Sequence, residues 1–368
     1  MQRFAFILHP SDAEDVARKF IIAKFMPDML VERSFAMLPS MKVSHIRGLQ
    51  SPYTEAEGWF IACPLTARMM MSLPVPYVLN KIIQGGRIAE KLGAGILGLG
   101  AFTKIVGDAG ITVAKNLNIP VTTGNSYTVA TAIESVREAA RMMGHDLKTA
   151  RVVILGATGS IGRVCALILA REVSNMTLVA RNERKLEDLA AKILYDTGLA
   201  VRVVSDSKKA LQSGDIIITV TSALDTLIEP EDLQAGAVVC DVSRPRDVSK
   251  RVAEVRDDVL VIEGGVVEVP GDVEFNLNFG FPPKMAYACM AETMILALEK
   301  RYESFTLGRE LDIGKVEEIA ALAKKHGFKL NGFRSFGRAV TPQEIEMIRL
   351  RASKEASISN NTIIPVNP

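Results

Sequence analysis

Residues 151–162, RVVILGATGSIG, decide the fold of this chain. The opening apolar run is typical of a buried parallel strand, and the glycine-rich loop leads into a helix predicted over 163–173. Glycines at such a turn let the backbone approach a pyrophosphate, and the helix N-terminus offers unpaired N–H groups to its oxygens. The pattern predicts a dinucleotide site formed by Gly156, Thr158, Gly159, Ser160, Ile161 and Gly162. The same loop could also be a structural turn without a ligand.

The next predicted strand, over 176–181, ends in arginine where NAD-binding proteins place an acid. A carboxylate at that position would repel a 2′-phosphate, whereas guanidinium groups bind phosphate. We therefore predict NADPH rather than NADH as the cofactor. The residues expected to contact it here, and at the end of a later strand over 215–220, are Arg181, Asn182, Arg184, Thr221 and Ser222. Alternatively, the basic residues are only the solvated start of a helix.

Strands and helices alternate through the middle of the chain, which predicts an α/β fold with a doubly wound parallel Rossmann sheet. Predicted domains are an N-terminal α/β substrate domain over 1–126, a Rossmann domain over 127–280 and a helical C-terminal segment over 281–368. Further elements are expected as helices over 11–24, 75–92, 127–144, 182–193 and 313–326, and as strands over 3–8, 119–122, 200–204, 237–242 and 259–262. The polar tail from Ser353 is expected to be mobile.

Composition excludes several classes of protein. The 368 residues carry a net charge of +2 and are 48% hydrophobic, so we expect no nucleic-acid partner. The four cysteines have no CxxC spacing and no histidine at metal spacing, so neither a disulfide nor a metal site is expected. No signal peptide or transmembrane segment is predicted, which makes a cytoplasmic location the expectation.

Two segments carry residues suited to chemistry on a carbonyl group. Cys289 is expected about two turns into a helix after Pro282-Pro283, where a thiolate could act as a nucleophile and Glu292 would oppose its ionisation. Hydrogen bonds to a developing oxyanion could come from the TTGNSY segment, through Thr123, Asn125 and Ser126. Simpler interpretations remain open: Cys289 could be a core residue, and the segment could be a turn with Ser126 as helix N-cap.

Six motifs together resemble the long-chain acyl-[acyl-carrier-protein] reductase family of cyanobacteria. They are GATGSIG, TTGNSYT at 122–128, LGLGAFTKIV at 97–106, GGVVE at 264–268, MAYACMAETMILALEKRY at 285–302 and KKHGFKL at 324–330. The resemblance covers the chain to about residue 330, weakly over 27–80. It implies that Cys289 is acylated by a thioester of acyl carrier protein or coenzyme A, and that NADPH reduces the acyl group to a fatty aldehyde. An aldehyde-consuming enzyme is a further partner that it suggests.

An elongated apolar pocket is expected to lead from Cys289 toward residues 94–125, with the glycine-rich segment AGILGLGAF at 94–102 as one wall. Two other functions remain open. A hydroxyl dehydrogenase similar to shikimate dehydrogenase would need a lysine–aspartate pair as acid and base, and a non-catalytic NADP-binding regulator would show no turnover. Reduction of an acyl thioester is the function that we predict.

Overall fold

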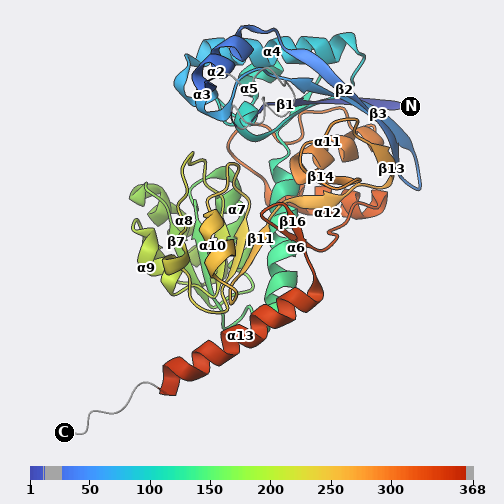
Figure 1. Ribbon diagram of the computed structural model, residues 1–368. Helices are drawn as coiled ribbons and strands as arrows, with labels where there is room; N and C mark the ends of the chain where they lie inside the picture. Colours follow the sequence, from blue (N-terminus) through green and yellow to red (C-terminus); the bar gives the residue numbers. More distant parts are fainter. Residues whose placement is uncertain (11, 13–26, 362–368) are drawn as a thin grey trace, which may run out of the picture. The chain divides into compact units, whose positions relative to one another are not determined.

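The computed structural model describes residues 1–10, 12 and 27–361. The helix predicted over 11–24 lies, apart from residue 12, outside the described residues. Figure 1 shows the chain coloured along its sequence.

Two compact units, each assembled from two separate segments, make up the chain. The first unit comprises Met1–Ala130 and Val266–Lys329, and the second comprises Thr131–Gly265 and Leu330–Pro368. The division therefore differs from the three consecutive domains predicted from the sequence, because the stretch that contains Cys289 packs with the N-terminal segment.

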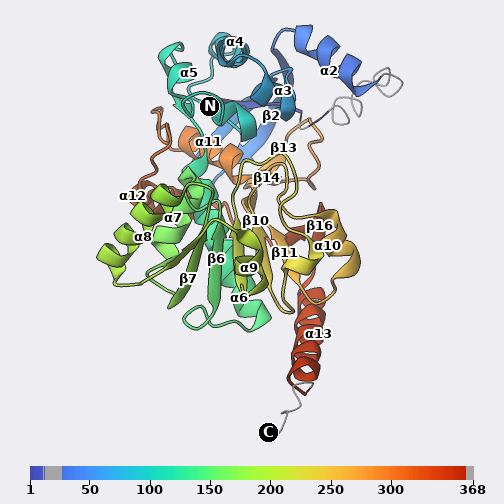
Figure 2. The same ribbon diagram turned by 90° about the vertical axis from the view of Figure 1, so that its left-hand side faces the viewer.

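The second unit holds a six-stranded sheet with the order β11-β10-β9-β6-β7-β8. All neighbouring strands pair in parallel, and Figure 2 shows several of them side by side. Its elements are β6 (Arg151–Leu155), α7 (Ser160–Leu169), β7 (Asn175–Val179), α8 (Glu183–Thr197), β8 (Arg202–Val204), α9 (Ser207–Gln212), β9 (Ile216–Thr219), η3 (Pro230–Asp232), β10 (Val238–Asp241), α10 (Lys250–Val255) and β11 (Leu260–Glu263). The strand order confirms the predicted doubly wound α/β fold.

The first unit holds a second six-stranded sheet, which mixes parallel and antiparallel pairs in the order β13-β2-β3-β1-β4-β5. Its strands are β1 (Gln2–Leu8), β2 (Met41–Gln50), β3 (Glu55–Ala62), β4 (Leu97–Leu99), β5 (Val121–Thr122) and β13 (Gly271–Glu274). The antiparallel pair β2 and β3 was not predicted, and β13 reaches β2 from more than 200 residues further along the chain. The predicted strand over 3–8 is confirmed, and of the strand predicted over 119–122 the structure forms only Val121–Thr122.

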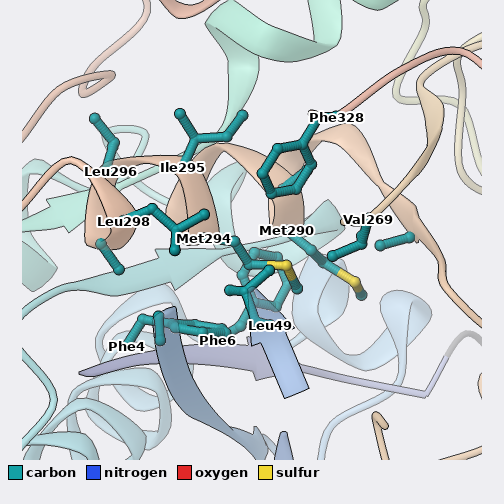
Figure 3. Close-up of a cluster of buried hydrophobic side chains, with 14 of the residues drawn as sticks. Phe4, Phe6, Leu49, Val269, Met290, Met294, Ile295, Leu296, Leu298 and Phe328 are labelled. Atoms are coloured by element: carbon teal, nitrogen blue, oxygen red, sulfur yellow. The ribbon is translucent and has the colours of Figure 1, made fainter. Parts of the chain in front are cut away.

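Alternating side chains of β1 divide the apolar core of the first unit between the two faces of its sheet. Ala5 and Ile7 pack into a cluster with residues of α4 (Val75–Lys91), while Phe4 and Phe6 join a second cluster with α11 (Ala288–Leu298). Figure 3 shows this second cluster, with Phe4, Phe6 and Leu49 below Met290 and Met294 and with Ile295, Leu296 and Phe328 above them in that view. The remaining helices of the unit are α2 (Asp28–Met37), α3 (Ala67–Ser72), η2 (Ala101–Lys104), α5 (Ile111–Lys115) and α12 (Ile313–His326).

The predicted C-terminal helical segment is not one body. Helices α11 and α12 belong to the first unit, since α11 is buried along nearly its whole length and needs an apolar partner surface. A hairpin of β15 (Phe333–Ser335) and β16 (Arg338–Val340) and the helix α13 (Pro342–Asn361) belong to the second unit. The hairpin is joined to β11 by a hydrogen bond from Gly337 N to Glu263 Oε1 at 2.7 Å. Residues 353–361 of the predicted tail form the end of α13.

Candidate active site

Cys289 lies in the first turn of α11, closer to the helix start than predicted. Helix α11 begins at Ala288 with Tyr287 as its N-cap, and no side chain caps it. The preceding residues form β14 (Met285–Tyr287), which pairs antiparallel with β12 (Val266–Glu268), so the helix cannot begin earlier. Unpaired N–H groups and the positive end of the helix dipole therefore lie near the thiol and favour its thiolate.

Exposure separates Cys289 from the other cysteines. Cys63, Cys165 and Cys240 are fully buried, whereas Cys289 is half-buried. Burial raises the pKa of Cys63 and of Cys165 to about 12, which makes both thiols inert near neutral pH. Of the four cysteines, Cys289 is thus the one that is not fully buried.

The turn before helix α6 (Asn125–Met143) is set directly against Cys289. Gly124 adopts a left-handed backbone with φ +72°, and a Cβ added to it would lie 2.3 Å from Cα and 2.4 Å from Cβ of Cys289. A residue with any side chain would push the two segments apart. This glycine therefore allows the TTGN turn to pack directly against the helix that carries Cys289.

Lys104 is the nearest cation to the thiol, and the sequence analysis did not single it out. It ends the helical turn η2, is half-buried, and its Nζ donates a hydrogen bond to Asn125 Oδ1 at 2.6 Å. Burial raises the pKa of Cys289, the positive charge of Lys104 lowers it, and Glu292 raises it further. The feature of the sequence that could have indicated Lys104 is that it is the one lysine in the apolar run AGILGLGAFTKIV.

Glu292 is a buried carboxyl that joins α11 to the TTGNSY segment. It accepts hydrogen bonds from Thr122 Oγ1 at 2.5 Å and from Tyr127 N at 2.9 Å. Tyr127 is in the first turn of α6, so the carboxylate satisfies a backbone donor at the start of that helix. Burial raises the pKa of Glu292, while these hydrogen bonds lower it. Its expected opposition to thiol ionisation is confirmed.

The polar residues predicted beside the thiol have different surroundings. Thr123 is fully buried, and its hydroxyl has no hydrogen-bond partner among the residues that the structure describes. Asn125 is buried and holds Lys104. Ser126 lies inside α6 and is not its N-cap; its Oγ accepts a hydrogen bond from Thr306 Oγ1 at 2.9 Å. Thr123 therefore keeps an unused hydroxyl, whereas Ser126 has a structural contact.

The glycine-rich run does not form the predicted wall of an open pocket. A Cβ on Gly98 would lie 2.2 Å from Thr293 Oγ1, and one on Gly100 would lie 2.7 Å from the ring of Phe6. These glycines allow β1 and α11 to pack tightly against β4 and its following turn. Neighbouring side chains already occupy the space that a channel beside these two glycines would need.

The glycine loop of the second unit fits a dinucleotide phosphate. Gly156 has φ +86°, and a Cβ on it would lie 2.8 Å from Val220 O. A Cβ on Gly162 would lie 2.4 Å from Gly156 O, so both positions require glycine. Gly159 is the N-cap of α7 and supplies no side chain, which leaves the helix N-terminus able to bind an anion. Thr158, Ser160 and Ile161 are partly exposed around this turn.

Of the residues predicted to bind the rest of the cofactor, some are exposed and others already have hydrogen-bond partners within the protein. Arg181 and Arg184 are exposed after β7, as a 2′-phosphate site requires. Asn182 caps α8, because its Oδ1 accepts a hydrogen bond from Lys185 N at 3.0 Å. Thr221 Oγ1 donates to Asp247 Oδ1 at 2.6 Å, while Ser222 is exposed. Asn182 and Thr221 thus have structural contacts of their own.

A pair of buried aspartates after β10 was missed by the sequence analysis. Besides Thr221, Asp247 accepts a hydrogen bond from Ser243 Oγ at 2.5 Å. Burial raises the pKa of Asp241 to about 7, and the nearby charge of Asp247 adds to that rise, although Arg244 opposes it. The sequence DVSRPRD directly after a buried strand was the available signal.

Within residues 1–10, 12 and 27–361, no helix has both the length and the apolar character that crossing a bilayer requires.

The fold and the glycine loop define a dinucleotide-binding protein, and its relatives place it among the NADP(H)-binding oxidoreductases. Residues 137–263 match the family described as Shikimate / quinate 5-dehydrogenase. The chain is 28% identical to the long-chain acyl-[acyl-carrier-protein] reductase of Synechococcus elongatus, over 86% of this chain and 94% of that protein. It is 33% identical to the aminotransferase PigE of a Serratia species, over 78% of this chain but 34% of that protein. The chain thus spans about a third of the latter relative.

Among solved structures, the nucleotide-binding domain of glutamyl-tRNA reductase from Thermoplasma volcanium is similar to 36% of this chain. The match covers 84% of that domain, with 18% identity and a TM-score of 0.26.

Proposed function

We propose that this chain reduces a long-chain acyl thioester to an aldehyde, with NADPH as the reductant and Cys289 as the nucleophile. The carrying observation is the half-buried Cys289 in the first turn of α11, set against Gly124 and influenced by the charge of Lys104. Similarity to the Synechococcus reductase over nearly its full length supports the choice of substrate. In this proposal the first unit binds the acyl group and the second binds NADPH.

The chemistry follows from the residues of the first unit. The Cys289 thiolate attacks the thioester carbonyl, the carrier thiol departs, and the acyl group remains on Cys289 as a new thioester. The unpartnered hydroxyl of Thr123 is suited to donate a hydrogen bond to the oxyanion of that step. NADPH supplies the hydride. In the overall reaction, the thioester, NADPH and a proton are converted to the aldehyde, the free thiol and NADP⁺.

Two carriers fit this chemistry, acyl carrier protein and coenzyme A, since both present a thiol ester. The Synechococcus relative is a reductase of acyl carrier protein esters, which favours the carrier protein. An enzyme that consumes the aldehyde is the partner that the product would need. Palmitoyl-CoA is the simpler first substrate because it requires no protein partner.

The test is incubation of the purified chain with palmitoyl-CoA and NADPH, followed by detection of hexadecanal. Aldehyde formation that depends on both compounds supports the proposal. Palmitoyl carrier protein is assayed in parallel, so that a preference for one carrier is not mistaken for inactivity. NADPH binding without turnover on either thioester contradicts the proposal and favours a regulator, and NADP⁺-dependent oxidation of hydroxyl compounds favours a dehydrogenase.

A further inference from the structure

Lys104 has features that simple packing does not explain. Its ammonium group is half-buried, and among the described residues no carboxylate forms a salt bridge with it. A lysine withdrawn from water without a counter-ion is unfavourable, so such a residue calls for a functional reason. One of its three N–H donors is used by Asn125 Oδ1, which leaves donors for another group.

The position of Lys104 is fixed relative to the thiol by two contacts. Asn125 is buried and holds the ammonium group at 2.6 Å. Gly124, the residue before Asn125, is in contact with the backbone of Cys289. The lysine is therefore held by the same turn that is set against the cysteine.

We propose that Lys104 is the counter-ion of the Cys289 thiolate and the acid that protonates the departing carrier thiol. This inference rests on the proposed function. In the acylation step, a bond forms between the Cys289 sulfur and the carbonyl carbon, and the bond from that carbon to the carrier sulfur breaks. The electron pair leaves with the carrier sulfur, which takes a proton from the Lys104 ammonium. When the aldehyde departs, Cys289 regains its thiolate and Lys104 is reprotonated by water.

The charges around the pair agree with this role. Burial is the largest effect on the pKa of Lys104 and holds it below its ordinary value, as a proton donor requires, while the charges of Cys289 and Glu292 oppose that lowering. Glu292 also faces the thiol and works against its ionisation. Removal of the lysine charge is therefore expected to move the titration of Cys289 to higher pH.

The first experiment needs no acyl substrate. Alkylation of the Cys289 peptide by iodoacetamide is followed against pH in the full chain, in Lys104→Met, in Lys104→Arg and in the exposed control Lys91→Met. We expect the midpoint to rise by about one pH unit or more in Lys104→Met, which is about a tenfold loss of thiolate. The alkylation midpoints of Lys104→Arg and Lys91→Met are expected to stay near that of the parent chain. An unchanged midpoint in folded Lys104→Met contradicts the counter-ion role.

The second experiment tests the proton donation. Acylation of Cys289 is measured with palmitoyl-CoA and with the phenyl thioester of palmitate, whose thiol departs without a proton because its pKa is low. The arginine variant keeps the charge but holds its proton too firmly to donate it. We expect Lys104→Arg to slow acylation by the CoA ester on the order of a hundredfold and to leave acylation by the phenyl ester nearly unchanged.

If Lys104→Arg slows acylation by the two esters equally, the acid role is wrong. The acid role is also wrong if this variant is acylated by both esters at the rate of the parent chain. The parent chain separates this failure from that of the proposed function, because a parent that takes no acyl group from either ester contradicts the proposed function itself. Melting temperature and NADPH affinity confirm that each variant is folded. The alkylation profile remains informative about Lys104 in every case.

Discussion

A side chain on Gly124 would place its Cβ 2.4 Å from the Cβ of Cys289, well inside van der Waals contact. The TTGN turn and the first turn of α11 approach each other this closely only because position 124 has no side chain. Lys104 donates a hydrogen bond to the next residue of the same turn, Asn125. The approach of two backbones, rather than one hydrogen bond, thus sets the geometry around the nucleophile.

Replacement of Gly124 by alanine should damage the site more than the fold. The left-handed backbone costs an alanine about 1–2 kcal/mol, and the overlap with Cys289 adds about 1–3 kcal/mol. Displacement of the thiol by a fraction of an ångström is expected to slow acylation on the order of a hundredfold. Urea unfolding and the rate of acyl-adduct formation measure the two effects.

Gly198 is the matched control for that variant. It also has a left-handed backbone, with φ +74°, but an added Cβ would meet no atom within 4 Å. Gly198→Ala should lose about 1–2 kcal/mol of stability and keep normal acylation. If Gly124→Ala behaves like Gly198→Ala in both assays, the close approach to Cys289 has no role in the chemistry.

Glu292 provides a second test of the site. Glu292→Gln removes a negative charge that raises the pKa of Cys289, so the thiol should become reactive at lower pH. It also weakens the hydrogen bonds from Thr122 and Tyr127, at a cost of about 1–3 kcal/mol in stability. Iodoacetamide alkylation against pH checks the first effect, with Glu274→Gln on an exposed position as the control. A midpoint that stays in place or rises is the contrary result.

Cofactor preference can be tested at Arg181. Because Arg181 is exposed two residues after β7, where NAD-binding proteins place an acid, NADPH should bind at least about tenfold more tightly than NADH, or about 1.4 kcal/mol. Arg181→Ala should lose most of this difference, while Arg171→Ala should keep it. Fluorescence titration with both nucleotides gives the ratio. Equal affinities in the parent chain would show that Arg181 does not recognise a 2′-phosphate.

Asp241 predicts a pH dependence of stability in the second unit. Its ordinary pKa of 3.8 is raised to about 7 in the folded chain, so the folded state holds the proton more tightly than the unfolded state. This contribution to stability is complete below about pH 4 and is lost as the pH rises through about 7. Asp241→Asn should remove that decline, and Asp225→Asn, on the surface, should not. Urea unfolding between pH 5 and 8 measures it, and parallel profiles for all three proteins would contradict the assignment.

Local patterns were sufficient to predict the doubly wound sheet of the second unit. Its strands are short apolar runs separated by helices, so the alternation alone indicated the doubly wound sheet, and the glycines at 156 and 162 marked the cofactor turn. The helix over 313–326 was predicted with the bounds that the structure gives, because Asp312 and Gly327 cap it. In each of these cases the determining contacts lie within a few residues along the chain.

The rest depended on contacts between distant segments. The three residues of β14 are apolar and match a helical pattern, and only their pairing with β12 shows that the helix starts later. That difference moved Cys289 from the second turn to the first. Lys104 and Asn125 are 21 residues apart, so no local pattern could reveal their hydrogen bond. The hairpin of β2 and β3 carries a mixed polar pattern and was missed for the same reason.

The most direct measurement is intact-mass analysis of the chain after incubation with palmitoyl-CoA in the absence of NADPH. We expect one palmitoyl adduct, mapped to the peptide that contains Cys289, and its disappearance when NADPH is added. Cys63→Ala should form the same adduct, whereas Cys289→Ala should form neither adduct nor aldehyde and should still bind NADPH. Full aldehyde production by Cys289→Ala would contradict the central claim, because it would show that the thiol is only part of the packing.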